Sequence, residues 1–299
     1  MESSTASAPS PEARARPASP VYGEVSRELP RIVIDRTASW RQWFADLGSY
    51  RAALYSLSLR NLRSRYKQAT LGIAWAVIQP VLQVAVFTVV FSRIAAIDSQ
   101  GIPYPLFALA GLLPWNVFAK IMNDGSTSLV INQHIITKLF FPRVYLVFAA
   151  GTSAVVDAAV GMVLLAVLMG VYGLAPSAGA LLALPVLAGV MLLAFGLSAL
   201  LAAVNARWRD VQHTIPFLLQ IGLLVTPIVY PPSTLSARWQ WLLAINPLTA
   251  VVAAFRSAVF GLPLPDSRTM LTSVAVCLAS VVIGLWYFRR AERTIVDIV

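Results

Sequence analysis

Long apolar stretches are the feature of this sequence that most restricts its fold. A helix needs about 20 apolar residues to cross a bilayer, and inside lipid only helices and closed barrels satisfy the backbone hydrogen-bonding groups. Continuous apolar runs of that length predict helices. Six such segments occur, at 69–92, 105–123, 144–172, 180–204, 211–230 and 269–288. The sequence therefore predicts an all-α membrane protein with six transmembrane helices. The segment 211–230 is the least regular, because it contains Pro216 and Pro227.

The composition agrees with this class. Of the 299 residues, 58% are hydrophobic and 12% are charged, which is about half the charged share of a soluble domain. The basic residues behind the net charge of +10 are scattered between apolar segments rather than gathered on one face, which argues against nucleic acid as a partner. The single cysteine, Cys277, lies in an apolar segment, so no disulfide framework or metal site is expected.

Basic residues concentrate in alternate loops, and such loops face the cytoplasm. One group precedes the first segment, and others lie in the second and fourth loops and after the last segment. Together these groups contain Arg51, Arg60, Arg63, Arg65, Lys67, Lys138, Arg143, Arg207, Arg209, Arg289, Arg290 and Arg293. We expect both termini in the cytoplasm.

The segments outside the spans predict the domain organisation. Residues 1–30 are rich in Pro, Ala and Ser and are expected to be a disordered tail. A cytoplasmic lead-in and an N-terminal amphipathic interface helix fill 31–68, the six-span domain fills 69–290, and 291–299 form a cytoplasmic tail. Within the domain, 231–266 holds two apolar helices, each too short to cross, which predicts an outer re-entrant or surface hairpin. Whether this hairpin gates a pore or is a packed cap stays open.

The helix predicted over 50–68 carries Arg60, Arg63 and Lys67 on one face. A basic amphipathic helix beside a span lies in the interface and attracts anionic headgroups. It is either a membrane anchor or a place where a phosphorylated lipid substrate approaches.

The loop INQHIITKLFFPR, residues 131–143, is polar and basic but keeps Ile131, Ile135 and Leu139 at helical spacing. Pro142 ends the helix. A short amphipathic helix in a cytoplasmic loop either lies on the bilayer or docks a soluble subunit.

Motifs for chemistry are absent from the sequence. No Gly-x-x-x-x-Gly-Lys-Ser/Thr loop, His-Glu-x-x-His motif or pair of catalytic carboxylates occurs, so we expect no enzyme active site. Asp157 lies deep in the third span. An intramembrane acid is a candidate functional group, or it pairs with a polar group of another helix.

Four stretches resemble one family when they are taken together in order. They are RNLRSRYKQATLGIAWAVIQP (60–80), AGLLPWNVFAKIMNDGSTSLVINQHIITKLFFPR (110–143), RWRDVQHTIPFLLQIGLLVTPIVYP (207–231) and INPLTAVVAAFRSAVFG (245–261). They look like the membrane subunits of ABC-type polysaccharide exporters, the Wzm-like permeases of O-antigen, capsule and teichoic acid export. The resemblance covers about 32–290.

This resemblance implies a homodimer that pairs with two copies of a separate ATP-binding cassette subunit, which binds ATP and Mg. The permease itself would hold no cofactor and would move a polyprenyl-pyrophosphate-linked polysaccharide across the bacterial inner membrane. By resemblance, 131–143 is a cytoplasmic coupling helix, the turn after the fourth span is a second contact, and 231–266 is the outer gate. The coupling candidates are Asn132, His134, Lys138, Phe141, Arg143, Arg207, Arg209 and Asp210. The pyrophosphate candidates are Arg60, Arg63 and Lys67.

Aromatic side chains can stack on sugar rings without fixed hydrogen-bond geometry, which suits a sliding polymer. The candidates for a glycan channel are Trp75, Phe87, Phe91, Trp115 and Tyr230. Each could instead pack in the core or lie in an interfacial aromatic belt.

Two other functions are compatible with six spans. An ion-coupled carrier predicts inverted repeats and several buried charges, and a membrane-embedded glycosyl or polyprenyl transferase predicts clustered carboxylates. The sequence displays neither pattern.

Overall fold

A computed structural model describes residues 41, 48–67, 74–138, 141–234, 243 and 246–298. All of the described residues belong to one compact unit, Ser39–Val299. The predicted tail 1–30, most of the lead-in and the first hairpin helix except Leu243 lie outside the described residues.

Every regular element in the described part of the chain is a helix. In order these are α2 (Arg51–Lys67), α3 (Trp75–Phe87), η2 (Thr88–Ile94), α4 (Tyr104–Ile131), α5 (Gln133–Ile136), α6 (Val144–Val171), η3 (Ala180–Leu182), α7 (Ala183–Arg207), α8 (Val211–Val225), η4 (Pro232–Thr234), α10 (Pro247–Phe260) and α11 (Ser267–Ile298). Five stretches are long and apolar enough to span a membrane: Trp75–Ile94, Tyr104–Ile131, Val144–Val171, Ala180–Arg207 and Ser267–Glu292. The predicted all-α, multi-pass membrane class is confirmed.

The predicted segment 211–230 forms a shorter helix than the other spans. Helix α8 ends at Val225 because Thr226 precedes Pro227 and takes an extended conformation, with ψ 136°. The chain then continues without regular structure, and the Thr226 hydroxyl accepts a 2.9 Å hydrogen bond from the Asn246 side chain just before α10. Residues 211–230 thus run from the end of α7 to the neighbourhood of α10.

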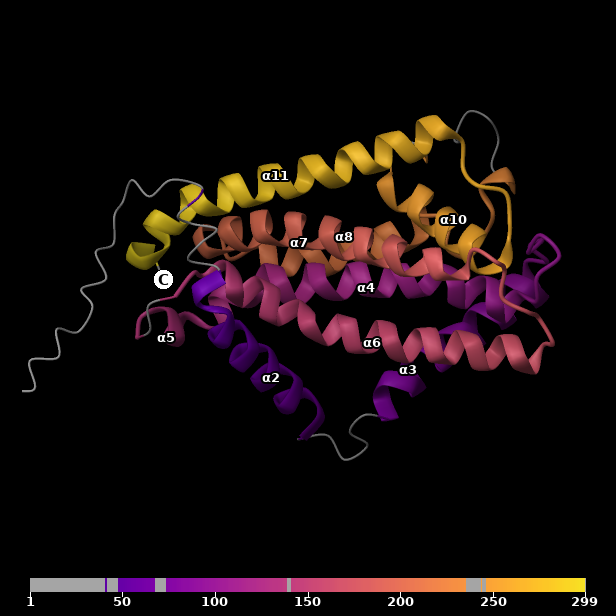
Figure 1. The fold of residues 1–299 in the computed structure, drawn as a ribbon, viewed down its shortest axis with the longest axis horizontal. Helices are drawn as coiled ribbons and strands as arrows, with labels where there is room; N and C mark the ends of the chain where they lie inside the picture. Colours follow the sequence, from indigo (N-terminus) through magenta and orange to yellow (C-terminus); the bar gives the residue numbers. More distant parts are fainter. Residues whose placement is uncertain are drawn as a thin grey trace, which may run out of the picture. The chain divides into compact units, whose positions relative to one another are not determined.

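Helix α4 lies at the centre of the bundle and is the most deeply buried of the five spans. It packs against α6 and α7, and α11 packs on α7 (Figure 1). The outer faces of α3, α6, α8 and α11 keep many large apolar side chains exposed, as expected for a protein whose surroundings are lipid or other apolar helices.

Small residues allow α7 and α11 to pack closely. A Cβ atom built on Gly284 of α11 would lie 1.9 Å from the carbonyl oxygen of Gly196 in α7. A Cβ on Gly196 would in turn meet the backbone of Val281 at 2.6 Å. Membrane helices associate through such small residues because lipid provides no hydrophobic driving force between them.

The two ends of the bundle carry different elements (Figure 1). At the end here called the α5 end, the Arg143 N–H donates to the Glu292 carboxylate over 2.9 Å, which joins the start of α6 to the end of α11. At the other end, here called the α10 end, the Ser177 N–H donates to the Val259 carbonyl over 3.0 Å. The predicted coupling loop and the end of α11 therefore share one end of the bundle.

Helices at the α10 end begin and end with recognisable caps. Helix α10 begins at Pro247, and the side chain of Asn246 before it accepts from the Leu248 N–H at 3.0 Å. Gly261 ends the helix with φ 73°. Asp266 precedes α11 and accepts from the Thr269 hydroxyl at 2.6 Å and the Thr269 N–H at 3.1 Å. These two bonds favour the carboxylate, so they lower the pKa of Asp266.

Candidate functional site

Helix α2, predicted to be the basic interface helix, packs on protein through its apolar arc. Leu54 and Leu57 lie against a buried cluster that includes Val144 of α6 and Phe288 of α11. Arg60 leaves this arc and donates to the Asn132 side-chain oxygen over 2.6 Å. The helix that carries the candidate pyrophosphate residues is therefore in direct contact with the residue between α4 and α5.

Arg63 is exposed on α2, while the side chain of Lys67 lies outside the described part. Of the three candidate pyrophosphate residues, Arg60 and Arg63 are thus exposed, and Arg60 also bonds to Asn132.

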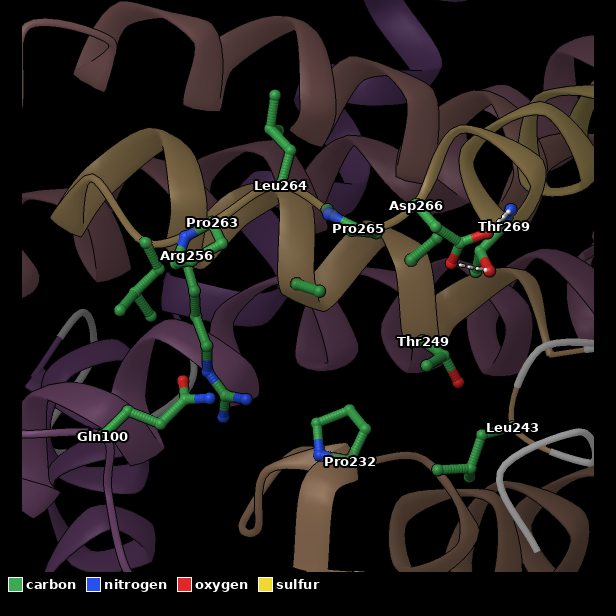
Figure 2. A pocket seen from close by; sticks show the side chains of 13 residues that line it. Gln100, Pro232, Leu243, Thr249, Arg256, Pro263, Leu264, Pro265, Asp266 and Thr269 are labelled. Atoms are coloured by element: carbon green, nitrogen blue, oxygen red, sulfur yellow. Dashed lines mark hydrogen bonds between the residues drawn. The ribbon is translucent and has the colours of Figure 1, made fainter. Parts of the chain in front are cut away.

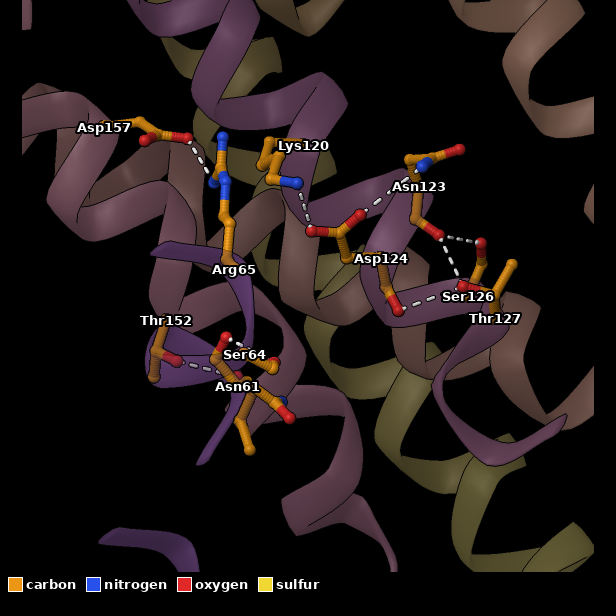
Figure 3. A network of polar contacts seen from close by, with 11 residues as sticks. Asn61, Ser64, Arg65, Lys120, Asn123, Asp124, Ser126, Thr127, Thr152 and Asp157 are labelled. Atoms are coloured by element: carbon orange, nitrogen blue, oxygen red, sulfur yellow. Dashed lines mark hydrogen bonds and ion pairs between the residues drawn. The ribbon is translucent and has the colours of Figure 1, made fainter. Parts of the chain in front are cut away.

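Asp157 has an ionic partner, as the second interpretation of the sequence predicts. Arg65 of α2 lies 2.7 Å from the Asp157 carboxylate, and the two side chains are 31% and 25% exposed (Figure 3). The pair joins α2 to the middle of α6, at a depth where an unpaired acid would be costly. Arg65 had no assigned role in the sequence pattern, because it falls outside the basic face of the helix.

The predicted coupling helix is shorter than its sequence pattern suggests. Only Gln133–Ile136 is helical as α5, Ile131 ends α4 and is exposed, and Ile136 is the buried isoleucine. Ile131 therefore belongs to α4 rather than to one helix with Ile135, and Leu139 lies outside the described residues. Asn132 interrupts the helix because its side chain bonds back to the Ser128 carbonyl at 2.8 Å.

The coupling candidates in this loop differ in exposure. His134 and Lys138 are exposed, whereas Phe141 is buried in the cluster that holds Phe288. Arg143 is half-buried, and its guanidinium donates to the Glu292 carbonyl over 2.6 Å. His134 and Lys138 are therefore the candidates in this loop that a soluble partner can reach directly.

The second predicted contact lies between α7 and α8. Arg207, Arg209 and Asp210 are exposed, and the Arg207 guanidinium lies 5.4 Å from the centre of the Trp208 ring. The Asn205 amide donates to the Ser126 carbonyl over 3.1 Å. This bond places the end of α7 beside the end of α4, so the turn shares the α5 end with His134 and Lys138.

Four of the five aromatic candidates share one apolar cluster, in which Trp115 is buried and against which Phe87, Phe91 and Tyr230 pack. Phe87 and Phe91 make an edge-to-face pair with ring centres 5.7 Å apart, and Trp75 is exposed at the start of the same span. Trp115 is buried and packs against Gly222 of α8. The Tyr230 hydroxyl donates to the Val225 carbonyl over 3.1 Å, where it caps the end of α8.

Sequence reasoning did not single out Arg256, which organises the α10 end. Its side chain is 4% exposed and donates to the carbonyls of Phe107 and Pro227, each at 3.1 Å, and to that of Ile228. The guanidinium also lies 3.5 Å from the centre of the Phe107 ring, a cation–π contact. Arg256 thus joins α10 to α4 and to the segment after α8. A charged residue inside the apolar run FRSAVF was the available signal.

A cavity of about 420 Å³ lies beside this cluster (Figure 2). Its lining is largely apolar, with Pro232, Leu243 and Leu262 among its residues, and Gln100 and Asp266 add polar groups. Within the described part of the chain, no group of three or more His, Cys, Asp or Glu side chains could hold a metal ion.

The comparisons with known proteins agree with this architecture. The ABC-2 type transporter family matches residues 52–260. An O-antigen export system permease protein, RfbA, of Myxococcus xanthus is 31% identical over 253 residues, which cover 83% of this chain and 96% of that protein. A protein with the same name from Klebsiella pneumoniae is 26% identical over 71% of this chain and 81% of its own length.

A more distant relative extends the comparison. The polysialic acid transport protein KpsM of Escherichia coli is 22% identical over 80% of this chain and 93% of its own length. The family match runs from α2 to the end of α10 and so includes the basic helix, α5 and the Arg256 cluster. The chain belongs to the ABC-2 type transporter family of membrane proteins.

Proposed function

We propose that this chain is the permease subunit of an ATP-driven ABC exporter that moves lipid-linked polysaccharide, such as O-antigen on polyprenyl pyrophosphate, across the bacterial inner membrane. The observation that carries this proposal is the match to an O-antigen export permease over 96% of that protein's length. The match to a polysialic acid transport protein supports a polysaccharide as the cargo.

In this proposal the chain crosses the membrane six times, with both termini in the cytoplasm. The five long spans supply five crossings, and α8 with the irregular residues 226–231 supplies the sixth. Basic residues gather at the α5 end, where Lys138, Arg143, Arg207 and Arg289 lie. Cytoplasmic loops carry such an excess of Lys and Arg, so the α5 end is assigned to the cytoplasm.

The energy source is a separate ATP-binding cassette subunit, present in two copies, that binds ATP and Mg. The exposed side chains of His134, Lys138 and Arg209 provide its docking surface on this chain. Two copies of the permease associate through apolar faces, for which α8 offers the exposed Phe217 and Leu218.

The lipid pyrophosphate approaches at α2, where Arg60 and Arg63 are cations near the cytoplasmic surface. The glycan then passes along the spans, where Phe87 and Phe91 of one helix offer adjacent rings for stacking. Trp115 and Tyr230 also border this path, and both contact α8, Trp115 at Gly222 and Tyr230 at the Val225 carbonyl.

The proposal is tested with the permease purified together with its ATP-binding subunit and placed in vesicles that contain lipid-linked glycan. Glycan should move across the vesicle membrane only when ATP is hydrolysed. Lys138→Glu should reduce glycan-stimulated ATPase activity by about fivefold or more. A fivefold change corresponds to about 1 kcal/mol, the lower end of typical coupling free energies. Lys138 is a better test than Phe141, because Phe141 is buried and its loss would disturb folding.

Arg93→Glu is the matched control, because Arg93 is an exposed cation at the end of η2 in the first span. It should leave the stimulation intact. ATP-independent movement of the glycan, or no movement at all with an active ATPase, would contradict the proposed function. Full stimulation in Lys138→Glu would remove the docking assignment.

A further inference from the structure

One face of the central helix α4 is polar, although the helix as a whole is apolar and buried. The face carries Asn116, Lys120, Asn123, Asp124 and Thr127. These positions are separated by three and four residues, or follow one another, so their side chains lie along one side of the helix. We call these five residues together with Gln83 of α3 the polar stripe.

The contacts within the polar stripe are mostly local to α4 (Figure 3). The Lys120 ammonium lies 2.6 Å from the Asp124 carboxylate, and the Thr127 hydroxyl donates to the Asn123 carbonyl over 3.0 Å. One bond leaves the helix, from the Asn116 amide to the Gln83 side-chain oxygen of α3 over 3.0 Å. The Asn116–Gln83 bond thus joins α4 to α3, whereas other residues of α4 pack on α6 and α7.

The stripe begins at the depth of the bilayer interior. Gln83 lies near the middle of the span Trp75–Ile94, and its bond holds Asn116 at the same level. On the other side of α4, Leu113 faces Gly161 and Ile121 faces Gly151, so Asn116 and Lys120 lie level with the middle of α6. From there the stripe runs toward the α5 end.

The side chains of the stripe are only partly covered by the rest of this chain. Those of Lys120 and Asp124 are 29% and 26% exposed, Asn123 is exposed, and Asn116 is partly exposed. Polar and ionisable groups at membrane depth face a bundle interior or a water-filled cavity, because exposure to hydrocarbon costs several kcal/mol each. The face of α4 that carries the stripe therefore borders water or a bundle interior rather than lipid.

We propose that the polar stripe is a wall of the aqueous pathway through which the hydroxyl-rich glycan passes. Carboxamides offer both donors and acceptors to sugar hydroxyls, as Gln83, Asn116 and Asn123 do here. Lys120 and Asp124 neutralise one another, so the stripe offers hydrogen bonds without a net charge that would hold an anion. This inference rests on the proposed function and adds to it the orientation of α4 and the residues that the cargo touches.

The test uses single cysteines in a Cys277→Ala parent, assembled with the ATP-binding subunit. Asn116→Cys and Asn123→Cys are placed in the stripe, and Val163→Cys and Val167→Cys, on an exposed apolar face of α6, are the matched controls. A small charged methanethiosulfonate should modify the stripe positions at least about tenfold faster than the control positions. Apolar surroundings raise the pKa of a thiol, and each unit of that rise lowers the fraction of reactive thiolate about tenfold. Modification of the stripe should also block ATP-driven glycan export, and glycan in transit should slow it.

Equal rates at Asn123 and Val163 would overturn the inference, as would full export after complete modification of Asn123. The Asn123 amide bonds to Asp124 within α4, so the Asn123 variant keeps the Gln83–Asn116 bond between α3 and α4. Failure of the two proposals is separable: absent export in the parent contradicts the function, while slow labelling of the stripe contradicts the water-facing wall.

Discussion

At the residue scale, Gly284 shows how one missing side chain permits a helix contact. Its Cα hydrogen faces the carbonyl oxygen of Gly196, and a Cβ there would lie 1.9 Å from that oxygen. The neighbouring atom is backbone, so it cannot rotate away as a flexible side chain would. Helices α7 and α11 must therefore separate if either glycine is replaced.

Gly284→Ala should lower the free energy of unfolding by about 1–3 kcal/mol, the range for overpacking a close contact. Gly189→Ala in α7 is the control because a Cβ there meets nothing within 4 Å. This control should be neutral or slightly stabilising, since alanine favours a helix more than glycine does. Thermal unfolding of the purified protein in detergent measures both. An unchanged melting temperature for Gly284→Ala would show that the two helices have room to spare.

The residue scale also shows which parts of the site a sequence can predict. The pairing of Asp157 is foreseeable, because an acid at membrane depth requires a partner, but the partner Arg65 is 92 positions away and is fixed by how α2 docks. The position of Arg256 is not foreseeable in the same way. Its acceptors are backbone carbonyls from two distant segments. Because every residue has a backbone carbonyl, the sequence does not indicate which carbonyls will accept.

At the element scale, α2 connects the proposed lipid-binding surface to the core of the bundle. Its apolar arc packs on α6 and α11 rather than on lipid, and its C-terminal half is held by the Arg65–Asp157 pair. Removing one partner leaves the other charge at membrane depth without its ion pair. Movement of α2 away from α6 requires the same bond to break.

Asp157→Ala should therefore destabilise the protein, and adding Arg65→Met should recover part of the loss. A double-mutant cycle on thermal stability should give a coupling free energy on the order of 1 kcal/mol, because both side chains remain partly solvated. The pair Lys120 and Asp124 is the control, since it lies within one helix and such pairs contribute only about 0.3–0.5 kcal/mol. Additive effects of Asp157→Ala and Arg65→Met would mean that the contact does not hold α2 in place.

The presence of the long spans follows from the sequence more closely than the positions where they end, since α4 continues to Ile131 and α11 to Ile298. Apolar length predicts the five long spans, because lipid leaves the backbone no alternative to a helix. The early end of α8 follows from Thr226 preceding Pro227, yet prolines inside α3 and α4 leave those helices intact. The short α5 depends on a bond from the Asn132 side chain to Ser128, which residue spacing cannot reveal.

At the scale of the whole molecule, the two ends differ in charge. The α5 end carries exposed basic side chains such as Lys138 and Arg209, whereas Asp98 and Asp266 lie in the connections near the α10 end. This difference in charge orients the molecule, because the cytoplasmic loops of membrane proteins are rich in Lys and Arg.

Single cysteines report this orientation directly. In the Cys277→Ala parent, Asp98→Cys should react with an impermeant maleimide added to spheroplasts, and Lys138→Cys should react only after the membrane is permeabilised. Both positions are exposed, so reactivity reports sidedness rather than burial. Reaction of Lys138→Cys from the outside would reverse the assigned orientation and remove the ATP-binding subunit from reach of α5.

The carbonyl cage around Arg256 has a consequence for the environment in which the protein works. A carbonyl oxygen has no proton to gain in the physiological range, and a guanidinium does not give one up in proteins. The anchorage of α10 to Phe107, Pro227 and Ile228 is therefore built without a carboxylate that acid could neutralise. A cell whose surroundings turn acidic would keep α10 anchored to α4, because protons cannot neutralise any of the three carbonyl acceptors.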